Sequence, residues 1–111
     1  MQDFTLLFRQ PSYDNSHLAK EEIEVIQKKW QDWMGGIAAQ GKMTSHARLD
    51  TQGKVLKSGG VITEGPFVEI RERLGGLIII KAENLEEATT LAHGCPALGL
   101  GGSVEIRQIL G

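Results

Sequence analysis

The spacing of apolar residues in the first third of the chain predicts a strand followed by a long helix. From Phe4 to Arg9 apolar residues alternate with a mixed set, which is the period of two of a half-buried strand. From Leu18 to Gln40 they recur every three or four positions, as on a helix with one apolar stripe. The stripe consists of Ile23, Ile26, Trp30, Trp33, Met34 and Ile37.

Four more strands and a second helix are predicted along the rest of the chain. The strongest strand is Leu77–Ala82, whose apolar run is typical of a central strand buried on both faces. Asn84 and Glu87 form a capping-box pattern, which marks the start of a helix. The remaining elements are strands over Met43–Leu49, Lys54–Lys57 and Ser103–Ile109 and a helix over Leu85–His93.

This order of elements predicts one α+β domain over residues 1–111. Two crossover helices between antiparallel strands give a ferredoxin-like βαββαβ sheet with both helices on one face, and the short hairpin is an addition to it. The other face of the sheet then needs a cover. Because the central strand is apolar on both faces, we expect that cover to be the same sheet of a second subunit, which gives a homodimer with a cavity between the sheets.

Composition and charge narrow the classes of function. A net charge of −2 lacks the basic footprint of a nucleic-acid-binding protein, and no apolar run approaches the roughly 18 residues of a membrane helix. The single cysteine, Cys95, allows no disulfide within the chain, and the three histidines have no metal-ligand spacing. The start of the chain lacks the basic residues of a signal peptide, so we expect a cytoplasmic protein without a metal or an organic cofactor.

One charged connection is the most distinctive local feature. A Gly-Pro pair opens it at Gly65 and Pro66, and Gly75 and Gly76 close it before the central strand. Because proline fixes its own φ and restricts the residue before it, the backbone there has one defined bend. Phe67 and Glu69 in this connection are candidate ligand-binding residues; the alternative for Glu69 is a solvated charged segment.

Several short motifs, in this order, resemble the YCII-related proteins of the DGPF type. They are Trp30–Trp33, Thr63–Phe67, Glu69 and Glu72, Leu74–Gly76, Gly94–Pro96 and Gly101–Arg107. The resemblance implies a dimeric α+β barrel in a small bacterial protein, with an activity that is mostly unassigned. Some relatives accompany sigma factors of the extracytoplasmic-function type, and a more distant one is a dehydrochlorinase that uses a histidine and an aspartate. Glu64 stands where the family usually has aspartate, so its carboxylate is carried one methylene further.

Two residues are candidates for moving a proton. His46 lies in a predicted strand, and an imidazole with a pKa near neutrality is the usual general base. Glu64 lies at the Gly-Pro turn, where its carboxylate can act as a base or orient a ligand. The alternatives are an exposed strand histidine and a solvated turn carboxylate.

The last strand carries a candidate ligand-binding pair. Glu105 and Arg107 share one of its faces, while Val104 and Ile106 share the other. If the apolar pair packs on the helices, the charged pair faces the cavity, where a guanidinium beside a carboxylate can hold a small anion. The alternative is an ion pair within the sheet or at the interface.

These observations support two hypotheses of different classes. The first is a barrel dimer that binds or transforms a small anionic or cyclic compound, with His46 or Glu64 moving a proton and Arg107 orienting charge. The second is a non-catalytic regulatory partner, as the sigma-factor association of the relatives implies. Whether the protein is an enzyme is left open by the sequence.

Overall fold

The computed structural model of the chain describes residues 1–11, 19–50, 52–64 and 72–111. Within these residues it contains six strands, two α-helices and one short 3-10 helix. In chain order they are β1 (Gln2–Pro11), α1 (Lys20–Ala39), β2 (Met43–Arg48), β3 (Lys54–Lys57), β4 (Val61–Glu64), β5 (Glu72–Ala82), α2 (Leu85–Ala92), η1 (Pro96–Leu100) and β6 (Ser103–Gln108).

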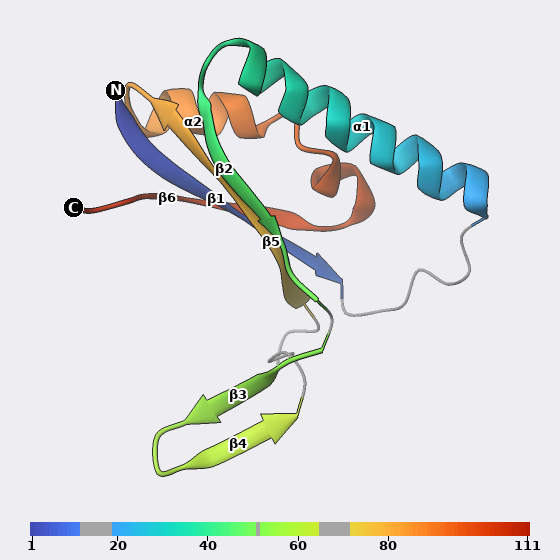
Figure 1. Cartoon of the computed structure of the whole chain (residues 1–111), viewed down its shortest axis with the longest axis vertical. Helices are drawn as coiled ribbons and strands as arrows, with labels where there is room; N and C mark the ends of the chain where they lie inside the picture. The colour runs from blue at the N-terminus through green and yellow to red at the C-terminus, as the bar shows by residue number, and fades with distance from the viewer. Residues whose placement is uncertain (12–18, 51, 65–71) are drawn as a thin grey trace.

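Four of the described strands form one antiparallel sheet in the order β2-β5-β1-β6. Each α-helix connects an outer strand to an inner strand of this sheet, α1 between β1 and β2 and α2 between β5 and β6 (Figure 1). The predicted ferredoxin-like α+β fold is therefore confirmed. The apolar strand predicted to be central is β5, and it lies between β2 and β1 as expected.

The core lies between the sheet and the helices, which share one side of it (Figure 1). The inner strands contribute the largest fully buried side chains, Phe4, Leu6, Ile78 and Ile80. Ala88 and Ala92 of α2 are buried on the helix side of the core. Asn84 caps that helix by accepting a hydrogen bond from the N–H of Glu87 at 2.8 Å. The capping prediction is confirmed.

Only the C-terminal half of α1 packs on the sheet. Ile37 is buried, and Trp30, Trp33 and Met34 pack against the core beside it. The first turns extend past the sheet, and Ile23 is 38% exposed there (Figure 1). The predicted apolar stripe is therefore covered along only part of its length, because the helix is longer than the surface on which it packs. Neither described helix is long and apolar enough to cross a membrane.

The hairpin of β3 and β4 projects from one end of the sheet, on the side away from the helices (Figure 1). Its strands pair in antiparallel register from Lys54 opposite Glu64 to Lys57 opposite Val61. The projection makes the chain less compact than its length predicts: the radius of gyration is 15.3 Å, against about 13 Å for a compact domain of this length.

Candidate functional site

The sheet has an open face, opposite the helices, that carries the predicted charged pair. Residues directly opposite in neighbouring strands share a face. One row across β2, β5, β1 and β6 is Ala47, Leu77, Leu7 and Glu105, and the next is Ser45, Ile79, Thr5 and Arg107. Most of these side chains are half-buried in the single chain. Val104 and Ile106 pack against the core on the other face. The side chains of β6 therefore alternate between the two faces as predicted.

Three charged side chains meet on this open face. Arg9 donates from Nη2 to Oε1 of Glu105 at 3.2 Å, and Nη1 of Arg107 lies 3.7 Å from Oε2 of the same carboxylate. The carboxylate therefore bridges two guanidinium groups, and the three residues together carry one net positive charge. Arg107 is 70% exposed, so most of its guanidinium is open to solvent.

The geometry of the three residues suits binding better than stability. Exposed ion pairs of this kind contribute about 1 kcal/mol or less to folding. A planar guanidinium open to solvent can instead bind a carboxylate or a phosphate through two parallel hydrogen bonds. Leu7, beside Glu105, supplies apolar surface against which the body of a small ligand can pack.

Arg9 is the site residue that sequence reasoning missed. The alternation of β1 already places it on the face of Thr5 and Leu7, away from the buried phenylalanines. The signal that identifies it is the adjacency of β1 and β6, which the ferredoxin-like order predicts. The Arg9 side chain then lies within reach of Glu105, diagonally across the strand pair.

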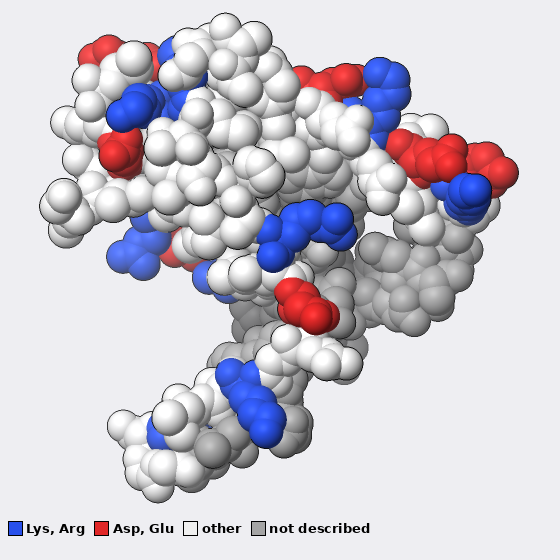
Figure 2. Space-filling view, viewed as in Figure 1, with Lys and Arg blue, Asp and Glu red and all other residues white. Residues whose placement is uncertain are grey.

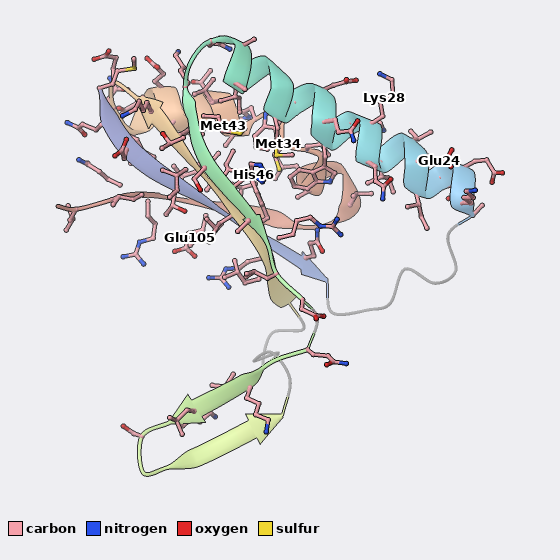
Figure 3. The ribbon with its side chains drawn as sticks, in the orientation of Figure 1. Glu24, Lys28, Met34, Met43, His46 and Glu105 are labelled. Carbon is pink, nitrogen blue, oxygen red and sulfur yellow. The ribbon has the colours of Figure 1, made fainter. Side chains whose placement is uncertain are left out.

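His46 lies away from this cluster. It is opposite Ile78, on the face of the sheet that carries the helices, and Figure 3 shows it beside Met34 of α1 while Glu105 lies on the other side. Its strand and β6 are the two outer strands, about 14 Å apart across the sheet. Within one subunit, His46 and Arg107 therefore do not share a site. His46 is exposed at its outer strand.

The other candidates belong to the hairpin and the connection after it. Glu64 is the last residue of β4, opposite Lys54 in the backbone register. Phe67 and Glu69 lie outside the described residues. Their assignment as ligand-binding residues stays a prediction. Among the described residues, no group of three or more His, Cys, Asp or Glu side chains is placed to hold a metal ion.

Cys95 is buried beside η1, with 3% of its surface exposed. Burial raises the pKa of its thiol from 9.0 to about 11, and a hydrogen bond with the backbone of Ala97 offsets part of that rise. A thiol of this kind is neutral near pH 7 and shielded from reagents. Cys95 therefore has the properties of a structural residue of the core.

The raised thiol pKa predicts a loss of stability in alkali. The folded pKa lies above that of the unfolded chain, so the contribution of the neutral thiol is complete below pH 9 and is lost as the pH rises toward 11. Two pKa units correspond to about 2–3 kcal/mol. Urea unfolding of the wild type and of Cys95→Ala at pH 8 and pH 10.5 measures the effect. We expect the difference between the two proteins to shrink at the higher pH; a constant difference would contradict the prediction.

Comparison with known proteins assigns the chain to a family. No curated protein matches it. The model of the YCII-related domain matches residues 11–111, which include β2 to β6, both helices and the connection between β4 and β5. This range also contains Glu105 and Arg107, while Arg9 precedes it. The chain therefore belongs to the YCII-related domain family.

Proposed function

We propose that this protein is a homodimer of the DGPF type that binds a small anionic compound between the open sheet faces of its two subunits. The observation that carries the proposal is the cluster of Arg9, Glu105 and Arg107 on a face that also carries the apolar side chains of Leu7, Leu77 and Ile79. Such a combination of apolar walls and a few convergent polar groups is typical of small-molecule sites. The single cysteine and the absence of any metal-ligand spacing in the sequence fit a cytoplasmic protein that needs no metal.

The open face supports the dimer. Leu7, Leu77 and Ile79 are half-buried in the single chain and lie on adjacent rows of the two inner strands. A second sheet packed face to face at about 10 Å would bury them. If the two-fold axis runs across the strands, β6 of each subunit faces β6 of the other, and each ligand could meet cationic groups of both subunits.

Arg107 binds the anionic group of the ligand in this proposal, and any proton transfer follows that binding step. If the bound compound is transformed, we propose Glu64 as the group that moves a proton, because its hairpin lies on the side of the open face (Figure 1). His46 of the same subunit lies on the other face of the sheet. A binding protein without chemistry would use the same cationic cluster.

Light scattering tests the dimer. We expect a mass of about 24 kDa, twice the chain's 12.1 kDa. Leu7→Asp should give monomers, because it places a charge at the centre of the proposed interface. Leu85→Asp is the matched control, since Leu85 is exposed on α2 on the other side of the molecule. A wild-type mass near that of one chain would overturn the dimer.

Thermal shift with a panel of small carboxylates and phosphate tests the ligand class. A compound at ten times its Kd should stabilise the protein by about 1.4 kcal/mol, a rise in Tm of roughly 5–10 °C. Arg107→Ala should abolish the rise. Arg48→Ala should keep it, because Arg48 lies opposite Gly76 on the helix side of the sheet.

Glu105 supplies a variant with the opposite expected effect. Its carboxylate occupies the position between two guanidinium groups that an incoming anion would take. Glu105→Gln removes this internal competitor and should strengthen anion binding. If the wild type and this variant are both dimers but bind no member of the panel, the proposed interface stands and the proposed anionic ligand is overturned. The regulatory role implied by the family resemblance would then be favoured.

A further inference from the structure

Glu105 has one carboxylate oxygen that can accept a hydrogen bond from a ligand. Its Oε1 already accepts a hydrogen bond from Arg9 at 3.2 Å. Its Oε2 lies 3.7 Å from Nη1 of Arg107, which is longer than the roughly 3.2 Å limit of an ordinary N–H···O hydrogen bond. Within the described residues no group donates a hydrogen bond to Oε2, and the side chain is 41% exposed. Because an ionised carboxylate has about four lone-pair sites, Oε2 is open to a donor.

Arg107 places a cation beside that oxygen. Its side chain is 70% exposed, and its strand neighbour on β1 is Thr5, an uncharged residue. A guanidinium has five N–H donors in a planar fork, and Glu105 approaches this one at Nη1. The other donors can therefore bind a carboxylate from solvent. Donors for a carboxylate and an acceptor for a hydroxyl group thus lie side by side, 3.7 Å apart, on the open face.

The charge of this part of the open face limits what can bind there. Arg9, Glu105 and Arg107 carry one net positive charge, and the other described residues of the two rows given above are uncharged. In the next row Asp3 and Lys81 pair at 3.3 Å, so they add no net charge; Figure 2 shows how charged side chains are spread over one face of the molecule. A monoanion would therefore neutralise the cluster, whereas a dianion would leave an excess negative charge beside Glu105. A cationic ligand group at Oε2 would lie close to two guanidinium groups of the same sign.

We propose that the anionic ligand of the open face is a 2-hydroxy acid, whose carboxylate binds Arg107 and whose hydroxyl group donates to Oε2 of Glu105. The carboxylate and the hydroxyl group of such a compound are on adjacent carbons, which matches the adjacent positions of the guanidinium and the open oxygen. Leu7, opposite Glu105, would lie beside the second carbon and favours an apolar substituent there. The inference rests on the proposed anion site and names the class of compound that this site takes.

Paired titrations of the wild type test the hydroxyl group. L-lactate and propionate differ only in the 2-hydroxyl, and nuclear magnetic resonance titrations at pH 7 and constant ionic strength give the Kd of each. We expect lactate to bind about tenfold more tightly, because it adds a hydrogen bond to a charged acceptor. Free L-alanine, with an ammonium group in place of the hydroxyl, should bind more weakly than lactate. Equal Kd values for lactate and propionate, or tighter binding of free alanine, would overturn the 2-hydroxy acid and leave the anion site in place.

A variant of Glu105 tests whether its carboxylate makes this distinction. Glu105→Ala removes the acceptor, so it should bind lactate and propionate with equal Kd values, and propionate at least as tightly as the wild type does. Glu86→Ala is the matched control and should keep the tenfold difference, because Glu86 is exposed on α2, on the helix side of the sheet (Figure 1). If Glu105→Ala keeps that difference too, the inference is overturned. If the wild type binds none of the three compounds, the anion site itself is overturned, and the 2-hydroxy acid with it.

Discussion

Phe8→Ala is expected to lower the free energy of unfolding by about 3–5 kcal/mol, the loss typical of a large aromatic residue removed from a core. Phe8 is 5% exposed and lies edge-on to two rings of α1, with centroids 5.0 Å from Trp30 and 5.8 Å from Trp33. The ring centroids of the two tryptophans are also 5.8 Å apart. Neither indole can therefore move into the space left by Phe8 without losing its contact with the other indole.

Urea unfolding followed by circular dichroism measures this effect. Leu85→Ala is the control, because Leu85 is 50% exposed and its truncation leaves no cavity. A small domain has only about 5–15 kcal/mol of stability, so Phe8→Ala should unfold at a far lower urea concentration. Equal and small losses in the two variants would show that the aromatic cluster does not hold α1 on the sheet.

Gly102→Ala should cost about 3 kcal/mol, the upper end for overpacking. A Cβ at this position would lie 2.5 Å from the backbone oxygen of Arg9 and 3.1 Å from that of Ala97. Both contacts are with backbone, and the N–H of Gly102 already donates to the Ala97 oxygen at 2.9 Å. Relief would require β6 to move away from β1 where Arg9 pairs with Ser103.

Gly99→Ala is the matched control three residues earlier. A Cβ there meets nothing within 4 Å, so the change should be neutral or stabilise by a few tenths of a kcal/mol up to about 1 kcal/mol through the unfolded state. Thermal unfolding of both variants measures the difference. If Gly102→Ala unfolds at the same temperature as Gly99→Ala, the close approach of Gly102 to the backbone of Arg9 does not limit the side chain at this position.

The sequence predicts the elements and their order because each has a clear periodicity, but it predicts their ends less well. The central strand was expected from Leu77, while β5 begins at Glu72. Its extension is set by pairing with Gln10 and Pro11 of β1, and hydrogen bonding of that kind needs no apolar side chains. For α1, periodicity identifies the apolar stripe but not how far the sheet beneath it extends, so it does not show that Ile23 is exposed.

In the candidate site, the alternation of side chains predicts the arrangement of one strand but not of another. Parity along β6 predicts the faces of Glu105 and Arg107, because that strand pairs with β1 without a register shift. Parity along β2 fails at a bulge between Met43 and Ser45, after which His46 faces the helix side. A bulge adds one residue to the strand and reverses the faces of all that follow, and nothing in the local sequence marks it.

The aromatic cluster also gives the protein a built-in optical reporter. Both tryptophans of the chain belong to it, and the indole N–H of Trp33 donates to the backbone oxygen of Leu91 at 3.0 Å. Tryptophan emission should therefore follow the docking of α1 on β1 and α2. The hairpin of β3 and β4, residues 54–64, contains no aromatic residue and does not contribute to that signal. Tryptophan emission and amide hydrogen exchange, recorded together, would separate unfolding of the sheet and helices from opening of the β3–β4 hairpin.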